Sequence, residues 1–464
     1  MTDRSYRSRT GATFRGIIND LKRNTESAAA ELGVEPELID RIIAGEMDVP
    51  AELVRRAVSS WPVNERDFFP IHDDAPDGVI VMRADESAKT SRVFQRGGTD
   101  YYEYRDTAMS RVAMFRPEWI KMLQPVTDDD PNNPAVRWNN GHFLYQFTYF
   151  VGAVNYYYEW EGRRHCAVMN TGDSVSGLPY APHSFTRRGA EPGLILALTY
   201  GGRLLGDAQH EIGALGPELA QQYAPAADDE LSAFAHLLTE QLADTLLTPA
   251  QLAGTSGMAP QRVAELLAGR ATPSAAEVDT LAEALRVNSR DLLPMIGTER
   301  DGVQIMRGAA AQTWFVPDVD APAYRVKALA GTRLCPSSRA LEIEVLGSDP
   351  AAAHQRTGLH QYCYVLGPDP VDLAWEHRGE RFGARLEPGD SLYLKPFVPH
   401  GFTRCGDGSA AVLALRIGGK VSGDARREAA ALGRATVRRL VSDNGQWYDP
   451  SRTSPTNGQR RGKR

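Results

Sequence analysis

The sequence predicts an α+β fold made of two tandem repeats, each a small helical domain followed by a strand-rich domain. Two observations predict it. Residues 33–70 align without a gap with residues 257–294. The phrase GDSVSGLPYAPHSFTR, residues 172–187, has a counterpart in GDSLYLKPFVPHGFTR, residues 389–404. Self-similarity of this kind indicates a repeated architecture.

Short helices are expected in the two aligned segments. Apolar residues recur there at helical spacing, as at Leu38, Ile42 and Ile43, and Gly and Pro separate the periodic runs. The pattern resembles the helix-turn-helix domain of phage-repressor-type regulators.

Strands are expected in the second part of each repeat, where aromatic and β-branched runs such as FLYQFTYFVGAVNYYYEW are bounded by Gly, Asp and Pro. In both repeated phrases a Gly-Asp turn, a strand, Pro-His and a later aromatic residue resemble the second motif of cupin barrels. The resemblance implies cupin (double-stranded β-helix) barrels. The expected domains are 1–75, helical and helix-turn-helix-like; 76–230, a cupin barrel with an iron site; 231–297, a second helical domain; 298–445, a second cupin barrel without metal; and 446–464, a polar basic tail expected to be disordered.

Composition narrows the class of protein. The 464 residues are 42% apolar and 24% charged, ordinary values for a globular protein. A formal net charge of −7 argues against nucleic acid or an anionic membrane as a partner. Four cysteines without C-x-x-C spacing predict neither a disulfide framework nor a zinc site. No apolar run follows the basic N-terminus and none of about 18 residues occurs, so we expect a cytoplasmic protein.

A metal site is predicted in the first half. Residues 139–152, NNGHFLYQFTYFVG, resemble the first cupin motif, in which two histidines, an acid and a closing glycine follow at set spacing. Asn140 takes the first histidine position, His142 the second and Gln146 the acid position, while His183 comes from the second motif. Residues four apart on a straight strand lie about 13 Å apart, so this triad requires the chain to bend.

The donor set indicates its chemistry. Two imidazoles and one oxygen leave open positions on the metal, which suits iron(II) and dioxygen. An amide in place of a carboxylate leaves the metal its full charge, and this favours a small chelating dianion such as a phosphonate, phosphate or dicarboxylate. The alternative is that His142 and His183 are buried histidines without a metal.

The second half is predicted to lack an iron site. His360 and His400 are taken as the counterparts of the two histidines, and Tyr364 stands where Gln146 is expected to have its counterpart. The alternative is that His354 or Glu342 supplies the missing ligand.

Three segments, NNGH, FQRGGTDYYEY and PHSF, resemble hydroxyethylphosphonate dioxygenases and methylphosphonate synthases, and the resemblance covers nearly the whole chain. By this resemblance His142 and His183 match the iron-binding histidines. Gln146 matches the glutamine ligand of the synthase-like branch. The implied cofactor is Fe(II).

The same resemblance implies a substrate site with catalytic contacts. Asn139 matches a substrate-contacting asparagine, and Arg96 and Tyr104 match the phosphonate-binding arginine and tyrosine. Lys22 matches a lysine that the helical domain places over the active site, from its own or a neighbouring subunit, and we expect a homo-oligomer. An arginine fork and a lysine point charge suit a phosphonate dianion.

The implied reaction is cleavage of the carbon–carbon bond of 2-hydroxyethylphosphonate with dioxygen. Dioxygenases form hydroxymethylphosphonate and formate, whereas synthases form methylphosphonate and carbon dioxide. Gln146 favours a synthase. Gly177 stands where many dioxygenases have a glutamate ligand and synthases a bulky aliphatic residue, and the space beside it favours the dioxygenase, which is the interpretation adopted.

Two other functions compete. Helix-turn-helix plus cupin is a layout of transcriptional regulators, but the segment in the recognition position carries Glu35, Glu37, Asp40 and Glu46 against Arg41 alone, a face that repels phosphates. The other alternative is a cupin epoxidase acting on hydroxypropylphosphonate.

Overall fold

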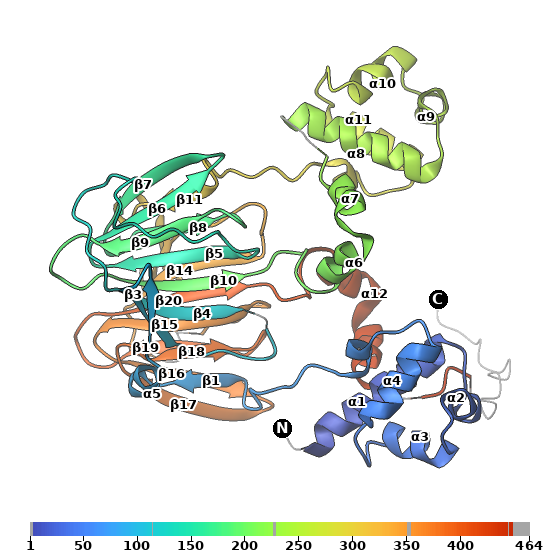
Figure 1. Cartoon of the computed structure of the whole chain (residues 1–464), viewed down its shortest axis with the longest axis horizontal. Helices are drawn as coiled ribbons and strands as arrows, with labels where there is room; N and C mark the ends of the chain where they lie inside the picture. Colours follow the sequence, from blue (N-terminus) through green and yellow to red (C-terminus); the bar gives the residue numbers. More distant parts are fainter. Residues whose placement is uncertain (1–2, 114, 226–228, 350–353, 444, 449–464) are drawn as a thin grey trace.

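Helices and sheets occupy different parts of the molecule (Figure 1). The computed structural model describes residues 3–113, 115–225, 229–349, 354–443 and 445–448. The α+β class is confirmed, because two groups of helices lie beside a body of antiparallel sheets. The predicted tail falls largely on residues 449–464, outside the described residues.

Each helical group has its own buried core. The first consists of α1 (Asp3–Asp20), α2 (Thr25–Leu32), α3 (Pro36–Ile43), α4 (Ala51–Ser60) and the 3-10 turn η1 (Glu65–Phe68). The second consists of α8 (Glu230–Thr245), α9 (Pro249–Ser256), α10 (Pro260–Leu267), α11 (Ala275–Leu285) and η3 (Ser289–Leu292).

Local sequence sets where these helices begin and end. Asn24 caps α2 by accepting a hydrogen bond from the Ser27 backbone, and Ser27 returns one to the Asn24 backbone. Gly33 then ends α2 with a φ of 64°, a conformation that glycine adopts without strain. Thr248 and Ser274 cap α9 and α11 in the same way.

The sheet body contains two antiparallel sheets of seven strands and two of three. The first large sheet has the order β11 (Val303–Met306), β8 (Ser174–Gly177), β5 (Tyr145–Val151), β10 (Leu194–Tyr200), β4 (Arg116–Met122), β3 (Thr99–Asp106) and β2 (Arg92–Arg96). The small sheet packed with it is β7 (Arg163–Met169), β6 (Val154–Trp160) and β9 (His183–Arg187).

The second large sheet has the order β1 (Val79–Met82), β18 (Ser391–Leu394), β15 (His360–Pro368), β20 (Ala410–Ile417), β14 (Ser338–Val345), β13 (Tyr324–Ala328) and β12 (Thr313–Val316). Its small sheet is β17 (Glu380–Leu386), β16 (Val371–His377) and β19 (His400–Arg404). Short helical turns α5 (Ala84–Lys89) and η4 (Gly308–Ala310) follow β1 and β11.

Each large sheet includes one strand from the other half of the chain. Strand β1 pairs with β18, and β11 pairs with β8, with Val303 opposite Gly177. The predicted boundaries 76–230 and 298–445 therefore do not contain either sheet completely. Neither half can complete its sheets without the other.

The two large sheets pack against each other through one face of β5 and β15. Phe147 and Tyr149 of β5 belong to the core between the sheets, together with Tyr362 of β15. Because side chains alternate along a strand, Gln146 and Thr148 face the opposite way, toward the core between β5 and the first small sheet. This alternation decides which residues can line a site inside the first half.

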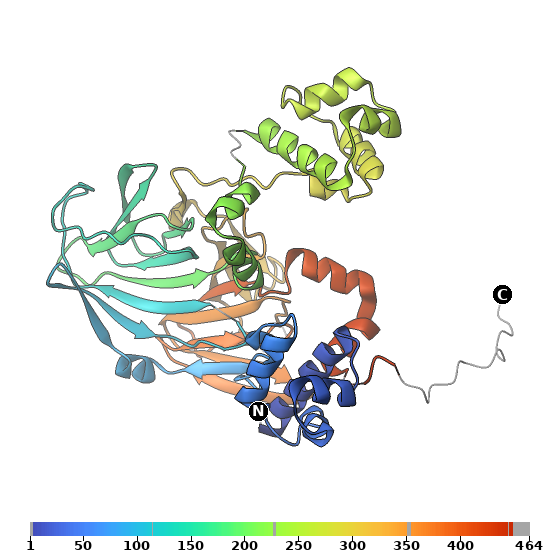
Figure 2. The ribbon, with the colours of Figure 1, turned by 45° about the vertical axis from the view of Figure 1, so that its right-hand side comes forward.

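Further helices connect the sheets to the helical groups. They are α6 (Asp207–Leu215), α7 (Pro217–Ala220), η2 (Gln221–Tyr223) and α12 (Gly423–Ser442). The sequence analysis did not predict α12, which runs from the sheets toward the first helical group (Figure 2). No helix in the described part of the chain has the length and apolar character needed to cross a membrane.

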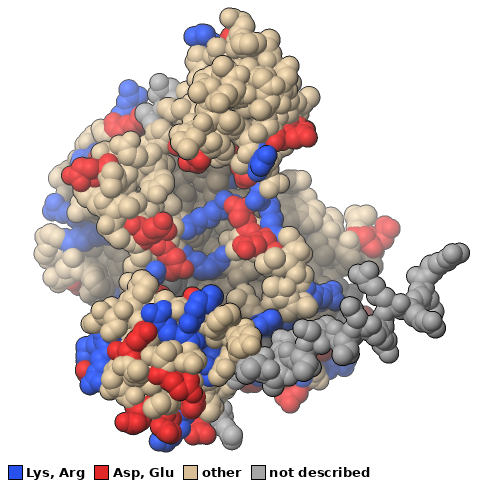
Figure 3. All heavy atoms as spheres, turned by 90° about the vertical axis from the view of Figure 1, so that its right-hand side faces the viewer, with Lys and Arg blue, Asp and Glu red and all other residues tan. Residues whose placement is uncertain are grey.

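Ion pairs join both helical groups to these connectors. Arg66 of η1 pairs with Asp207 at 2.8 Å, and Arg290 of η3 pairs with Asp424 at 2.6 Å. Figure 3 shows basic and acidic side chains gathered in the hollow between the two groups. Arg66 and Arg290 occupy corresponding positions in the aligned segments 33–70 and 257–294.

Candidate metal centre

The structure brings the three predicted metal ligands together. His142 lies in the loop before β5, Gln146 lies on β5 and His183 begins β9. The Nε2 atom of His142 is 3.0 Å from Oε1 of Gln146, and the two imidazole rings are 5.4 Å apart between centroids. The required bend lies between the two residues, at Phe143 and Leu144. Gly141, just before His142, has a φ of 72°, and a Cβ there would lie 2.4 Å from the Tyr180 carbonyl oxygen.

Backbone carbonyls fix the tautomer of both histidines. Nδ1 of His142 donates to the Leu144 carbonyl at 2.9 Å, and Nδ1 of His183 donates to the Ala181 carbonyl at 2.9 Å. Each Nε2 therefore presents a lone pair to the cavity. Burial also lowers the pKa of His183 to about 4, so its imidazole is neutral at pH 7.

The contact between His142 and Gln146 fits a cation. With Nδ1 protonated, Nε2 of His142 and Oε1 of Gln146 are both lone-pair donors, yet they face each other at 3.0 Å. Adjacent ligands of an octahedral ion with bonds of about 2.1 Å are about 3 Å apart. Among the described residues no three His, Cys, Asp or Glu side chains form a metal cluster, so the amide would be the third ligand.

Thr148 orients this amide and is a residue that the sequence analysis missed. Nε2 of Gln146 donates to Oγ1 of Thr148 at 3.0 Å, and Thr148 is fully buried. The bond directs Oε1 away from Thr148 and toward His142. A polar residue two positions along the strand shares the face of Gln146, so strand alternation could have identified it.

Asn139 lies directly beside His183. Its Oδ1 accepts hydrogen bonds from the backbone N–H of His183 at 2.7 Å and of Gly141 at 3.0 Å. Its Nδ2 is 3.0 Å from Nε2 of His183, the atom that would hold a metal. Asn139 thus links the loop that carries His142 to the start of β9.

Arg96 and Tyr104 border the same interior from β2 and β3. Arg96 donates to the Arg137 carbonyl at 2.7 Å, and its guanidinium lies 4.7 Å from the ring centre of Tyr102, a second residue missed from the sequence. Burial raises the pKa of Tyr104, and the Arg96 charge opposes that rise. Arg96 also contributes, after burial, to the lowered pKa of His183, so its charge is felt at the metal ligand.

Lys22 is the one predicted site residue that lies elsewhere. It is exposed in the turn after α1, where its ammonium donates to the Asn19 carbonyl at 3.2 Å and lies 5.5 Å from the Trp447 ring centre. The cavity at the histidines is lined by His142, Gln146, Thr148, Tyr156, Val175, Gly177, Leu178, Ala181 and His183. Within a single chain, Lys22 does not contact this cavity.

The predicted correspondence in the second half is wrong by three residues. Gln146 lies opposite Thr199 and Gly177, whereas Gln361 lies opposite Arg416 and Leu394. The distance along the chain from Thr199 to Arg416, and from Gly177 to Leu394, equals the distance between the two repeated phrases, so these residues are counterparts. Gln361, and not Tyr364, is therefore the counterpart of Gln146.

The loop before each strand follows the same register. The Tyr180 backbone donates to the His142 carbonyl at 2.7 Å, and the Phe397 backbone donates to the Thr357 carbonyl at 2.7 Å. Thr357 is thus the counterpart of His142, while His360 corresponds to Tyr145 and faces the core between the sheets, where its Nδ1 lies 2.7 Å from the Tyr393 hydroxyl. The suggested substitute ligand Glu342 also lies there, bound to Tyr149.

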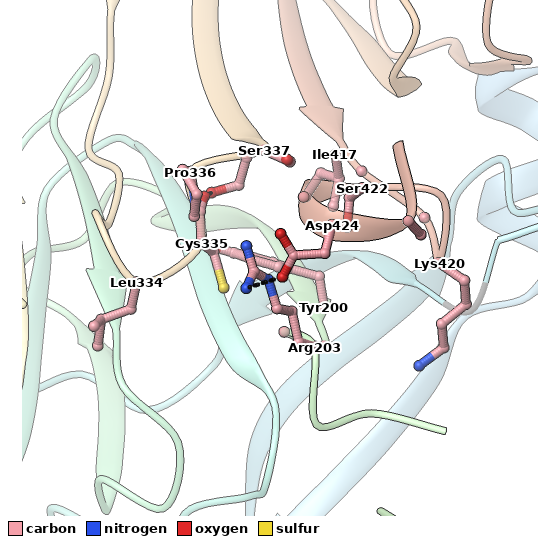
Figure 4. A pocket seen from close by; sticks show the side chains of 17 residues that line it. Tyr200, Arg203, Leu334, Cys335, Pro336, Ser337, Ile417, Lys420, Ser422 and Asp424 are labelled. Atoms are coloured by element: carbon pink, nitrogen blue, oxygen red, sulfur yellow. Dashed lines mark hydrogen bonds and ion pairs between the residues drawn. The ribbon is translucent and has the colours of Figure 1, made fainter. Parts of the chain in front are cut away.

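A larger cavity, of about 210 Å³, lies where β10 and β20 end beside α12 (Figure 4). Tyr200 and Cys335 line it, and Arg203 crosses it to pair with Asp424 at 3.3 Å. It contains none of the predicted site residues. Because Asp424 also pairs with Arg290, this cavity belongs to the junction with the second helical group.

No family model matches the chain. Methylphosphonate synthase of Nitrosopumilus maritimus (strain SCM1) is 43% identical over 449 residues, covering 96% of this chain and 97% of that protein. A structure of PhpD with cadmium and hydroxyethylphosphonate, 19% identical with a TM-score of 0.71, covers 92% of this chain and 99% of its own and shows the fold alone.

A structure of Streptomyces albus HEPD, with 2-hydroxyethylphosphonate and Fe(II) bound, is 46% identical to this chain. It covers 96% of this chain and 100% of its own, with a TM-score of 0.92. With two such relatives spanning almost its whole length, the chain belongs to the family that contains methylphosphonate synthase and 2-hydroxyethylphosphonate dioxygenase.

Proposed function

We propose that this chain is an Fe(II)-dependent oxygenase that cleaves the carbon–carbon bond of 2-hydroxyethylphosphonate with dioxygen. The observation that carries the proposal is the match to a structure holding both this compound and Fe(II), across 96% of the chain. The ligands are His142, Gln146 and His183, which place two neutral imidazoles and an amide oxygen at one cavity. When bound, Fe(II) supplies the redox centre and open positions for dioxygen and substrate.

The chain's own residues bind and orient the phosphonate. Arg96 offers a charged fork of N–H donors. Tyr104, close to Arg96, and Asn139, beside His183, add neutral polar groups. The neutral amide of Gln146 adds no negative charge beside a dianionic substrate. This charge balance supports a phosphonate in preference to a neutral alcohol.

We propose further that Lys22 reaches the iron site from a second copy of the chain. Its exposure, and its distance from its own cavity in the fold, support this arrangement and a homo-oligomer. The test mixes Lys22→Ala chains, which should bind substrate weakly, with inactive His183→Ala chains and measures activity at a low substrate concentration. Hybrids should regain activity, because one site then has intact ligands and the partner's lysine. No recovery would assign Lys22 to its own subunit.

The finer architecture is part of the proposal. We assign each large sheet and its small sheet to a cupin barrel, and each helical group to a helix-turn-helix-like domain, in the order 1–75, 76–230, 231–297 and 298–445, with β1 and β11 exchanged. The equal strand orders of the two halves support this. The four free cysteines agree with the cytoplasmic location expected from the sequence.

The product is hydroxymethylphosphonate with formate, the dioxygenase outcome. After cleavage, the methylene carbon receives either oxygen or hydrogen, and space beside the ligands influences which arrives first. Gly177 lies opposite Gln146, and a Cβ there would be 3.8 Å from the Tyr156 hydroxyl oxygen and would meet no closer atom. A side chain could therefore enter beside Gln146 without a clash at its Cβ, and the glycine leaves that space unfilled.

A synthase forming methylphosphonate is the second candidate, because Gln146 matches the amide ligand of that branch. Phosphorus NMR of the reaction products separates the two. Mostly hydroxymethylphosphonate is expected, and Gly177→Ile should divert part of the flux to methylphosphonate. Mostly methylphosphonate from the unaltered chain would establish the synthase, and an unchanged ratio in Gly177→Ile would refute the role of this space.

A further inference from the structure

The second half of the chain contains a partly buried positive charge, Arg416, whose hydrogen-bond partners are neutral side chains. Nε of Arg416, on β20, donates to Oε1 of Gln361 at 2.7 Å, and a second guanidinium nitrogen donates to Oε1 of Gln355. No ion pair to Arg416 occurs among the described residues, and burial lowers the pKa of its guanidinium. A cation that loses part of its hydration and has no carboxylate partner needs other polar groups to compensate it.

One of these partners, Gln361, stands at a metal-ligand position of the first half, and His400 beside it stands at another. Gln361 is the counterpart of Gln146, and His400 is the counterpart of His183. Both are almost fully buried, at 1% and 2% exposure. Nδ1 of His400 donates to the Val398 carbonyl at 2.9 Å, just as Nδ1 of His183 donates to a carbonyl two residues before it.

The guanidinium contacts the atom that would be a metal donor. In the first half Oε1 of Gln146 faces Nε2 of His142, whereas in the second half Oε1 of Gln361 accepts from Arg416 and its Nε2 lies 3.2 Å from Nε2 of His400. The position of His142 is taken by Thr357, which cannot replace an imidazole. Two of the three ligand positions are thus retained, and the oxygen of the retained glutamine already contacts a cation.

We propose that the second barrel holds a latent site for a divalent transition metal, in which the Arg416 guanidinium supplies the positive charge in place of the ion. This inference rests on the proposed iron site of the first barrel. A fixed internal cation satisfies the Gln361 oxygen without a metal and limits the chain to one metal ion.

The space for a substrate is closed at the same place. Leu394 stands where the first half has Gly177 and is fully buried. It lies opposite Gln361 on β18, so its side chain occupies the region that Gly177 leaves open beside Gln146. The second barrel is therefore a structural partner that lends β11 to the first barrel's sheet and binds no substrate.

The test restores the missing imidazole and removes the cation. Thr357→His with Arg416→Thr copies the first-half residues His142 and Thr199. Cobalt(II) per chain, measured by elemental analysis after anaerobic loading and dialysis, should rise from one in the wild type to two in this double variant. Adding His400→Ala should return the value to one, because it removes a ligand of the second site alone.

A chain that already carries His142→Ala and His183→Ala, and so lacks the first site, tests the second site independently of the proposed function. That background should bind no cobalt, and adding Thr357→His/Arg416→Thr should give one ion per chain. A double variant with native circular dichroism that still binds one ion would overturn the latent site. So would a wild-type chain with a second ion that His400→Ala removes. Cobalt retained by the background alone would overturn the first site and not this one.

A single change tests the cation role should the double variant not fold. Arg416→Met leaves both glutamine oxygens without a donor and should lower the melting temperature by several degrees more than Arg416→Lys, which keeps a charge. Arg339→Met, at an exposed arginine of β14, is the control and should change it little. Equal melting temperatures for the methionine and lysine variants would overturn the role of Arg416.

Discussion

Replacing Thr148 with valine removes one hydrogen bond and leaves the shape of the side chain almost unchanged. Oγ1 of Thr148 is the acceptor for Nε2 of Gln146 at 3.0 Å, and the residue is fully buried. In the valine variant the amide N–H has no acceptor on that side. The amide can then rotate, and its oxygen no longer faces the two imidazoles in a fixed position.

The expected loss follows from the burial of the freed group. A buried donor left without a partner costs about 1–3 kcal/mol. This cost falls on the conformation of Gln146 in which Oε1 faces the metal. Because about 1.4 kcal/mol corresponds to a tenfold change in an equilibrium constant, the metal affinity should be about 5- to 150-fold weaker. Removal of groups that orient metal ligands costs roughly 10- to 100-fold in other proteins, in agreement with this range.

Anaerobic titration with Fe(II) measures this affinity directly. Thr186→Val is the matched control, because Thr186 of β9 is also fully buried but lies near the Tyr157 hydroxyl, at 3.4 Å, and contacts none of the proposed metal ligands. The control should bind Fe(II) like the wild type. Equal affinity in Thr148→Val and the wild type would refute the assignment of the Gln146 oxygen as a ligand.

Three further outcomes are expected. His142→Ala and His183→Ala should retain almost no iron in metal analysis, while His400→Ala keeps it; loss of iron in the third variant would move the site. Arg96→Ala and Lys22→Ala should weaken substrate binding by about 1.5–3 kcal/mol with iron content intact, and unchanged affinity in both would remove them from the pocket. Burial lowers the folded-state pKa of His400 to about 4, so the unfolded chain takes up a proton first as the pH falls. The free energy of unfolding should therefore fall by up to about 3 kcal/mol between pH 6.5 and pH 4. Urea unfolding of His400→Gln should depend less on pH, and an equal pH dependence would contradict the buried neutral imidazole.

The sequence was sufficient for the fold class and for three side chains of the first half, His142, Gln146 and His183, that the structure brings together. Helical periodicity with Gly and Pro boundaries predicted α3, which begins at Pro36, and α10, which begins at Pro260. The spacing of His142 and Gln146 predicted their meeting once a bend was allowed. The chain makes this bend at Phe143 and Leu144, directly before β5.

The second half was mispredicted because strand faces alternate. A shift of an odd number of residues moves every side chain to the other face of the sheet, so an error of three placed His360 and Tyr364 in the site when they face the core between the sheets. The loops before β5 and β15 differ in length between the halves, and sequence spacing from the repeated phrases did not reveal this. Pairing with β10 and β20 fixes the true register.

Contacts between distant segments also could not be predicted from the sequence. Nothing in the local pattern indicates that β11 pairs with β8 or that Lys22 lies beside Trp447. Such contacts depend on how the two halves and the helical groups pack together. The orientation of Gln146 by Thr148 was accessible from alternation but was overlooked.

Oxygen uptake tests the central claim most directly. The iron-loaded wild-type chain should consume dioxygen only when 2-hydroxyethylphosphonate is present, and His183→Ala, which loses a ligand, should consume none above background. No uptake by the iron-loaded wild type, or uptake by His183→Ala equal to the wild type, would contradict an iron(II) oxygenase built on His142, Gln146 and His183.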